Sequence, residues 1–283
     1  MQLKNGSLKN DYEEKGFIVV PDVLKSDEIA LYKTRTSAVV RGEYPDEAKG
    51  RLMRDIRVAK GLVPTPDDPE DEMWKILNPD RFDITFRDFL YTPKILDVLE
   101  LLLGPDLICF LLMVIYKPRK IESVHPLHQD AYYFPFGPHD NILGVWVPLD
   151  DTDEDNGGLQ VIPGSHKGSL REHEMPGTLT NAFAYEVENA RSSPETVALK
   201  VQAGSAVFFH SRLMHTTRSN FSEKMRRVLT LHACSAQCTL QPDATIDELG
   251  MTLVRGKTHS GCVQPNLNTS LAVSLGDDAL NRP

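Results

Sequence analysis

The sequence has few cysteines, no long apolar run and no excess of positive charge. Four cysteines among 283 residues are too few for a disulfide scaffold, and the C-x2-C pairs of zinc sites are absent. The longest apolar stretch, residues 95–104, holds two acidic residues and is shorter than the ~18 residues of a membrane span. A net charge of −9 argues against a nucleic-acid-binding protein, whose surface is usually basic. We therefore expect reduced thiols, a cytoplasmic protein without an apolar signal segment, and neither nucleic acid nor membrane as a partner.

Before residue 107 the chain has the signals of helices and turns. Residues 17–20 form a predicted short strand. Ser26 is the expected N-cap of the following helix, because acidic residues occupy its first turn. Thr92, followed by a proline, predicts the start of another helix that ends at Gly104. The proline-rich residues 42–83 between these helices are expected to form a long surface loop or a lid.

From residue 107 onward, short apolar runs alternate with turn residues. The runs are LICFLLMVIYK, ILGVWVPL, GLQVIP, VALKV, AVFFH and RVLTLHA. Turns such as Pro163-Gly164 separate them, which is typical of antiparallel sheets in a sandwich or barrel. We expect a single, mainly β domain with flanking helices over residues 1–283: a helical part over 1–106, a β core over about 107–240 and a C-terminal extension over 241–283.

The tripeptide His128-Gln129-Asp130 is the centre of the candidate chemistry. In a strand, residues i and i+2 project from the same face, so this histidine and this carboxylate can converge on one point. A third ligand has to come from elsewhere, and His210 and His215 are both candidates. Two histidines and one carboxylate that leave open positions form the facial triad of non-haem Fe(II) oxygenases.

An arginine lies eleven residues after His215, at Arg226. An oxygenase that uses 2-oxoglutarate needs a cation for the distal carboxylate, which arginine can bind through two hydrogen bonds. Arg227 is the competing candidate. Strand alternation puts only one of these two arginines on the inner face, and the residues alone leave the choice open.

Together these motifs resemble the phytanoyl-CoA dioxygenase family of Fe(II)/2-oxoglutarate-dependent oxygenases. The resemblance runs from about residue 11 to residue 238 and is densest in HPLHQDAYYFPFGPHDNILGVWVPLDD, NGGLQVIPGSHKGSL and GSAVFFHSRLMHTTRSNFSEKMRR. It implies a distorted double-stranded β-helix, a jelly-roll barrel similar to that of the cupins. It also implies His128, Asp130 and His215 as the iron ligands, since the distal ligand of the family is the second histidine of the last segment.

The resemblance further implies residues that contact the co-substrate. Arg226 falls at the spacing of the family's arginine and is expected to bind the C5 carboxylate of 2-oxoglutarate. Met113, Trp146 and Lys75 resemble additional co-substrate contacts of the family. Gln129 points away from the metal in a regular strand, but a twist there would turn it toward the co-substrate or the substrate, so it belongs to the predicted site.

The implied reaction is a hydroxylation that uses Fe(II), 2-oxoglutarate and O2 and releases succinate and CO2; desaturation, epoxidation and ring rearrangement share its first steps and stay open. Asp130 favours this outcome over halogenation, because related halogenases have glycine or alanine at this position. One or two of the aromatic residues within 132–136 are expected to line the substrate. The resemblance implies a small organic substrate, either an acyl-CoA or a natural-product intermediate. Two alternatives stay open: a metal-binding protein on the same barrel that does not use 2-oxoglutarate, and a non-catalytic binding protein.

Overall fold

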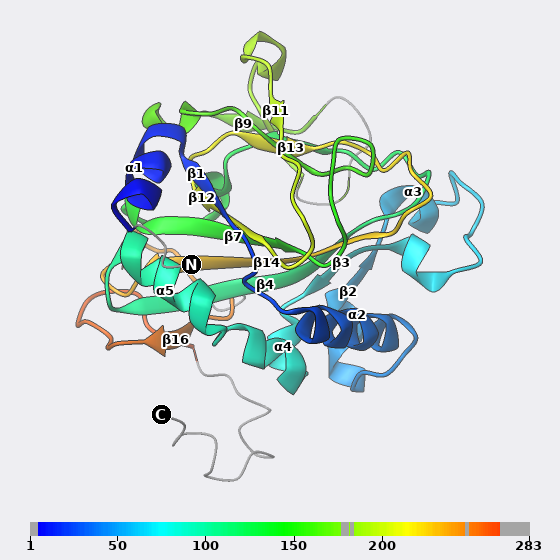
Figure 1. The fold of residues 1–283 in the computed structure, drawn as a ribbon, viewed down its shortest axis with the longest axis horizontal. Helices are drawn as coiled ribbons and strands as arrows, with labels where there is room; N and C mark the ends of the chain where they lie inside the picture. The colour runs from blue at the N-terminus through cyan, green and yellow to red at the C-terminus, as the bar shows by residue number, and fades with distance from the viewer. Residues whose placement is uncertain (1–4, 177–180, 182–183, 247–248, 267–283) are drawn as a thin grey trace.

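The computed structural model describes residues 5–176, 181, 184–246 and 249–266 (Figure 1). Its α-helices are α1 (Asn5–Lys15), α2 (Ser26–Val40), α3 (Ile56–Ala59), α4 (Ile84–Phe89) and α5 (Pro93–Leu103). Its strands are β1 (Phe17–Val20), β2 (Leu52–Arg54), β3 (Met73–Leu77), β4 (Leu107–Lys117), β5 (His125–His128), β6 (Phe136–Gly137), β7 (Ile142–Pro148), β8 (Leu159–Val161), β9 (His173–Glu174), β10 (Glu186–Val187), β11 (Val197–Ala198), β12 (Ala206–His210), β13 (His215–Thr217), β14 (Arg226–Ser235), β15 (Thr239–Leu240) and β16 (Thr252–Arg255). Within these ranges no helix has the combination of length and apolar character that a membrane span requires.

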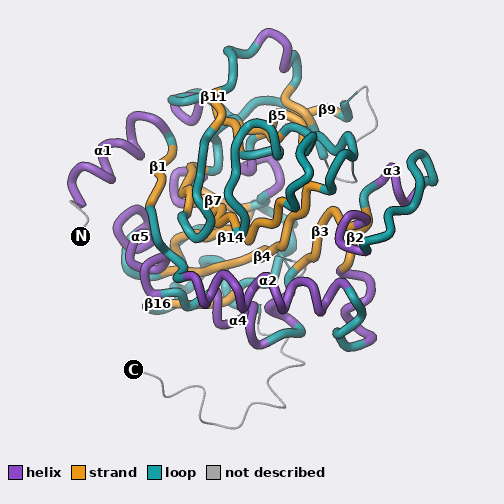
Figure 2. Tube along the Cα trace, turned by 45° about the vertical axis from the view of Figure 1, so that its right-hand side comes forward, coloured by secondary structure: helices purple, strands orange, loops and turns teal. Residues whose placement is uncertain are grey.

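Two antiparallel sheets face each other and form a jelly-roll barrel. The larger one, the major sheet, has the strand order β1-β12-β7-β14-β4-β3-β2, and β16 also pairs with β4. The smaller one, the minor sheet, has the order β11-β8-β13-β5. In Figure 1 the minor sheet lies above the major sheet, and α2, α4 and α5 lie below it; Figure 2 shows the same helices along the outer side of the sheet. The predicted mainly β fold with a jelly-roll core and flanking helices is confirmed.

Strand alternation divides the major sheet into an outer and an inner face. Val114 of β4, Val145 of β7 and Leu231 of β14 are fully buried on the outer face, in the apolar core that the helices cover. Met113 and Trp146, their neighbours along the strands, line a cavity on the inner face. Because successive side chains of a strand point to opposite faces, each strand contributes one row to the core and another to the cavity.

The helix boundaries follow the local sequence. Helix α5 starts after Thr92 with a proline in its first turn and ends at Gly104, as predicted; the φ of +89° at this glycine is a conformation that other residues rarely adopt. Helix α2 begins one residue earlier than expected, so that Ser26 is its first residue and Lys25 its N-cap. The backbone N–H of Lys25 donates to the carboxylate of Glu28 at 2.7 Å, which ties the first turn together.

Residues 42–83 are not one continuous loop, and this prediction is wrong in part. Strands β2 and β3 lie within the segment and extend the major sheet, because β3 pairs with β4 through Lys75 and Ile115. The prolines lie outside both strands. Arg119 holds the intervening turn through ion pairs with Asp68, at 3.1 Å, and with Asp71. The segment therefore supplies a wall of the barrel.

Candidate metal centre and co-substrate cavity

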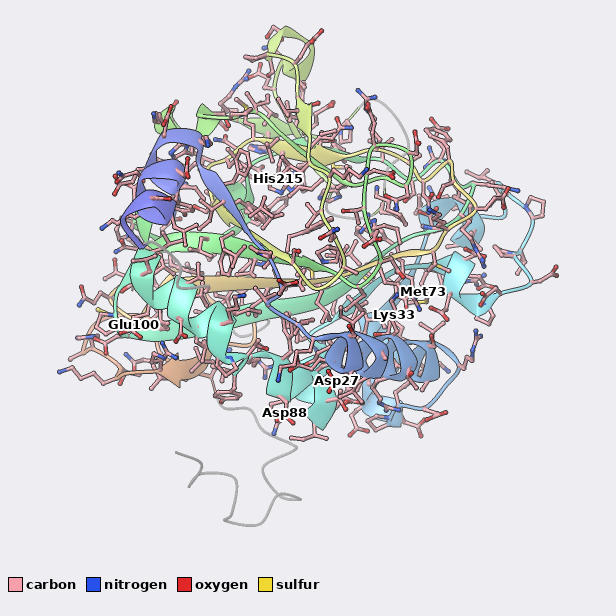
Figure 3. All side chains as sticks on the ribbon, in the orientation of Figure 1. Asp27, Lys33, Met73, Asp88, Glu100 and His215 are labelled. Carbon is pink, nitrogen blue, oxygen red and sulfur yellow. The ribbon has the colours of Figure 1, made fainter. Side chains whose placement is uncertain are left out.

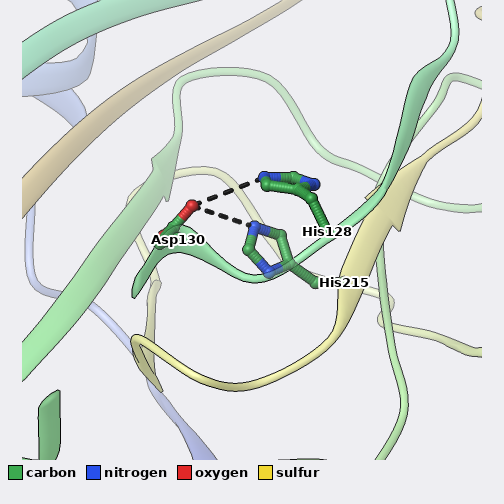
Figure 4. A group of neighbouring side chains, drawn as sticks. All are labelled: His128, Asp130 and His215. Atoms are coloured by element: carbon green, nitrogen blue, oxygen red, sulfur yellow. Dashed lines mark ion pairs between the residues drawn. The ribbon is translucent and has the colours of Figure 1, made fainter. Parts of the chain in front are cut away.

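The three predicted metal ligands come together between the two sheets. His128 ends β5 and pairs in register with His215, the first residue of β13 in the minor sheet; Figure 3 places His215 above the major sheet. Asp130 does not continue the strand, because a 3-10 turn (Asp130–Tyr133) begins there. The expected convergence of His128 and Asp130 is thus produced by a strand end and a turn rather than by strand alternation. Figure 4 shows the three side chains facing one point.

The ligand atoms are spaced as a single ion requires. Asp130 Oδ1 lies 3.4 Å from His128 Nε2 and 3.6 Å from His215 Nε2. One candidate donor atom from each of the three residues lies within 4.8 Å of the other two, and all three residues are buried. Neighbouring ligands at right angles around an ion, with bonds of about 2.1 Å, would be about 3 Å apart. Two imidazoles and one carboxylate are the donor set of a non-haem Fe(II) site, so the residues fit this ion.

Hydrogen bonds orient both imidazoles. His128 Nδ1 donates to the carbonyl of Pro126 at 2.8 Å, and His215 Nδ1 donates to the carbonyl of Leu213 at 2.9 Å. Since a carbonyl oxygen only accepts, Nδ1 carries a proton in each ring and Nε2 faces Asp130. Burial lowers the pKa of His215 to about 4, with His128 contributing to the shift. The histidine is therefore neutral, and able to bind a metal, at physiological pH.

The carboxylate of Asp130 is ionised despite its burial. Desolvation opposes the charge, but the nearby His215 and His232 and the hydrogen bond from His232 hold the pKa of Asp130 well below its usual value. An anionic oxygen between two Nε2 atoms is a favourable site for a cation.

A cavity of about 910 Å³ contains the metal triad and the predicted co-substrate residues. Arg226 lies in its wall, only 1% exposed, and Nε, Nη1 and Nη2 have no hydrogen-bond partner among the described residues. Burial lowers the pKa of Arg226 to about 9, an effect that Asp150 partly offsets. A buried guanidinium without a partner is costly. The group fits an anionic ligand, and a carboxylate is the geometry that arginine binds through two hydrogen bonds.

Lys117 and Lys75 also line the cavity. Lys117 pairs with Arg226 in register across β4 and β14, and its Nζ donates to the carbonyl of Ser123. Burial and Arg226 hold the pKa of Lys117 well below its usual value. Lys75 projects from β3 into the cavity, with its Nζ 4.4 Å from the centre of the Trp74 ring. Burial lowers the pKa of Lys75 to about 8, although Asp130 favours its charged form.

Met113 and Trp146, the remaining predicted co-substrate contacts, lie in a row across the major sheet. Thr230 of β14 pairs with Met113 of β4 on one side and with Trp146 of β7 on the other. All three line the cavity, and the hydroxyl of Thr230 is buried without a hydrogen-bond partner among the described residues. The row thus combines two apolar surfaces with one free polar group.

The structure does not bring Gln129 to the cavity. Its side-chain amide donates to the carbonyl of Arg212 at 2.7 Å and accepts from the backbone N–H of Arg171 at 2.9 Å. These bonds tie the metal-ligand segment to two loops. The side chain points away from the cavity, as a regular strand would place it, and nothing in the geometry supports the predicted co-substrate contact.

The two competing residues have other partners. His210 Nε2 lies 3.0 Å from Asp140 Oδ1, away from the triad. Arg227 points to the other face of β14, where its Nε donates to Asp150 at 3.0 Å and its Nη1 lies 3.4 Å from Glu70. Of the two histidines and two arginines that competed for these roles, His215 and Arg226 line the cavity.

Several cavity residues were not predicted from the sequence. They are His125, Thr217, Thr230, His232 and Lys117, all of which line the cavity. Tyr133 and Phe134, from the predicted aromatic wall, also line it. Strand parity from Arg226 would have indicated Thr230 and His232, which lie four and six residues further along β14. His125 has no such signal, because β5 holds one extra residue between it and His128, which breaks the strand alternation; the two ring centroids are 4.4 Å apart.

Together with the barrel, this donor set places the protein among the non-haem Fe(II)- and 2-oxoglutarate-dependent oxygenases. Residues 12–228 match the family model described as Phytanoyl-CoA dioxygenase (PhyH), and the chain belongs to this family. It is 31% identical over 233 residues to peroxisomal phytanoyl-CoA dioxygenase from Homo sapiens, and the alignment covers 80% of this chain and 67% of that protein. The protein of the same name from Bos taurus is 33% identical over 238 residues, with the same shares covered.

Solved structures show the same fold. The alpha-ketoglutarate-dependent epimerase SnoN from nogalamycin biosynthesis aligns with a TM-score of 0.63 at 22% identity, covering 93% of this chain and 96% of that one. EctD from S. alaskensis, solved with 2-oxoglutarate and 5-hydroxyectoine, aligns with a TM-score of 0.65 at 17% identity, covering 90% and 85%. The family and the triad identify an enzyme that uses Fe(II), 2-oxoglutarate and O2 on a small-molecule substrate.

Proposed function

We propose that the enzyme hydroxylates an unactivated C–H bond of a small organic substrate. One oxygen atom of O2 enters the substrate as a hydroxyl group, the other enters succinate, and 2-oxoglutarate loses CO2. When bound by His128, Asp130 and His215, Fe(II) supplies the redox chemistry of this reaction. The observation that carries the proposal is the buried, unpartnered guanidinium of Arg226 in the same cavity as the triad.

The residues of the chain bind and orient the reactants. Arg226 receives the distal carboxylate of 2-oxoglutarate through charge-assisted hydrogen bonds, which are strong in a site that excludes water. Trp146 and Met113 pack beside the co-substrate. Tyr133 and Phe134 provide an apolar surface for the substrate next to Asp130. Such walls hold the reacting carbon in place and exclude water.

Acyl-CoA thioesters and natural-product intermediates are the proposed substrate classes. Support for the first comes from the relatives, which are named phytanoyl-CoA dioxygenases. Support for the second comes from structural neighbours of nogalamycin biosynthesis such as SnoN. The cavity of about 910 Å³ is large enough for a drug-sized molecule or an acyl chain. A cytoplasmic location stays a prediction, since the mammalian relatives are named as peroxisomal.

Substrate-stimulated succinate formation tests the proposal. Purified enzyme with Fe(II), 2-oxoglutarate and O2 is screened against acyl-CoAs and candidate metabolites, with succinate and hydroxylated product measured together. We expect equal amounts of both for the true substrate, and neither with Asp130→Ala. Fe(II) binding without any succinate would favour a metal-binding protein that does not use 2-oxoglutarate. Failure to bind Fe(II) anaerobically would favour a non-catalytic binding protein.

A further inference from the structure

His232 lies on the inner face of β14 and contacts the carboxylate of Asp130. Its Nε2 is 3.0 Å from Asp130 Oδ2. The other oxygen, Oδ1, faces His128 Nε2 and His215 Nε2 at 3.4 and 3.6 Å. The two oxygens of one carboxylate therefore have different roles available: Oδ1 points to the position of a metal, and Oδ2 is held by a residue outside the triad.

Aromatic packing fixes the ring of His232. Phe110 stacks on it with 5.7 Å between centroids, and Phe134 meets it edge to face at 4.9 Å. The ring is 4% exposed, and its Nδ1 is buried with no hydrogen-bond partner among the described residues. Because the ionised carboxylate of Asp130 only accepts hydrogen bonds, Nε2 carries the proton and donates to Oδ2. The bond to Asp130 is thus the one polar contact that the described residues give this ring.

A β-bulge places Phe110 opposite His232. Thr230 pairs with Met113, whereas His232 pairs with Phe110, so β4 holds one extra residue in this interval. Leu111, within the bulge, has a φ of +50°, a conformation that costs energy for a residue other than glycine. Bulges beside active sites redirect side chains. Here the strained residue lies in the strand segment that supplies a ring packed on His232.

We propose that His232 is a positioning residue that makes Asp130 a monodentate ligand through Oδ1. A carboxylate whose Oδ2 is free can rotate, or bind a metal through both oxygens. Either change would take up space or a coordination position that 2-oxoglutarate and O2 require. The inference rests on the metal site of the proposed function, but it concerns a side chain that does not bind the metal. Removal of a group that orients a metal ligand typically weakens metal binding by about 10- to 100-fold.

Calorimetric titration of the purified apo enzyme with Fe(II), under anaerobic conditions, tests the proposal without any need for turnover. His232→Phe keeps the aromatic packing and removes the donor, so we expect Fe(II) to bind about 10- to 100-fold more weakly. His232→Gln places an amide N–H near the position of Nε2 and should bind within a few-fold of the wild type. Thermal unfolding of each apo variant checks that the fold is unchanged.

His210→Phe is the matched control. His210 is also 4% exposed and also lies 3.0 Å from an aspartate oxygen, but that aspartate, Asp140, is not in the triad. Its replacement should leave Fe(II) affinity unchanged. Wild-type affinity in His232→Phe, or equal weakening in the Phe and Gln variants, would overturn the proposal. If His232→Phe does not fold, His232→Asn, whose amide is too short, takes its place against His232→Gln. Absence of Fe(II) binding by the wild type would instead refute the proposed function.

Discussion

Replacing Arg226 with methionine should weaken 2-oxoglutarate binding without weakening the fold. Methionine keeps the apolar stem of the side chain and removes the guanidinium, whose three nitrogens have no partner among the described residues. A charge-assisted hydrogen bond contributes roughly 1.5–3 kcal/mol. Loss of a bidentate contact, at roughly 1.5–4 kcal/mol, corresponds to an increase in Kd of about 10- to 1000-fold. The unfolding free energy of the apo protein should stay equal or rise, because a buried and unpaired charge is removed.

Arg227→Met supplies the opposite pattern. The side chain of Arg227 is 14% exposed and pairs with Asp150, which also binds Lys33 at 2.8 Å. Burial acts against the charge of Asp150, but Arg227 and Lys33 lower its pKa, so losing Arg227 should reduce stability above the pKa of this carboxyl. Its 2-oxoglutarate affinity should not change, since Arg227 is on the outer face.

Anaerobic calorimetry of the Fe(II)-loaded proteins with 2-oxoglutarate, and urea unfolding of the apo proteins, measure the two effects separately. Wild-type affinity in Arg226→Met would refute the assignment of the guanidinium to the co-substrate. A loss of several kcal/mol in apo stability in the same variant would show that Arg226 is a structural residue instead. Weakened co-substrate binding in Arg227→Met would mean that the register of β14 is wrong.

Two further predictions concern Lys75 and the choice of histidine. Burial lowers the pKa of Lys75 to about 8, whereas the unfolded chain keeps this proton up to about 10.4. The unfolding free energy of the apo protein should therefore rise from about pH 8 to about pH 10, and the affinity for 2-oxoglutarate should fall over the same range because Lys75 loses its charge. Lys75→Met should remove both pH dependences. Unchanged slopes in unfolding and binding titrations of the variant would contradict this. Fe(II) at 100 times its Kd should stabilise the wild type by about 2.7 kcal/mol, and in thermal unfolding His215→Ala should lose this gain while His210→Ala keeps it. The reverse result would exchange the two histidines.

Local sequence signals predicted the longer strands of the major sheet, β4, β7, β12 and β14. The run LICFLLMVIYK is β4 and AVFFH is β12, because apolar residues between turn residues leave few alternatives. Strand β3 was missed, since its inner row exposes Lys75 to the cavity and the short segment follows several prolines. In the sequence, a buried lysine that faces a cavity cannot be distinguished from a solvent-exposed lysine. The lysine on the inner row of β3 thus breaks the apolar pattern by which a buried strand is predicted.

The site residues divide in the same way. His128 and Asp130 were identified from their spacing, although a turn rather than a strand places the carboxylate. The choice between His210 and His215 depends on pairing of β13 with β5, a long-range contact that no local pattern contains. His232 was accessible by strand parity from Arg226, but the bulge in β4 that pairs it with Phe110 has no signal in the local sequence. A positive φ at a leucine cannot be read from the sequence.

Charge explains why the metal and the co-substrate belong together in this cavity. Its inner face gathers Arg226, Lys117 and Lys75 around a triad with one carboxylate. A divalent cation alone adds to this positive charge, whereas the dianion 2-oxoglutarate alone has no metal for its chelating end. Bound together, their charges cancel, so each should strengthen the binding of the other by the same factor. Burial lowers the pKa of all three cations in the apo protein, and this same desolvation strengthens a contact between a cation and a carboxylate. The dianion therefore supplies negative charge to cations that are buried, and costly, in the apo protein.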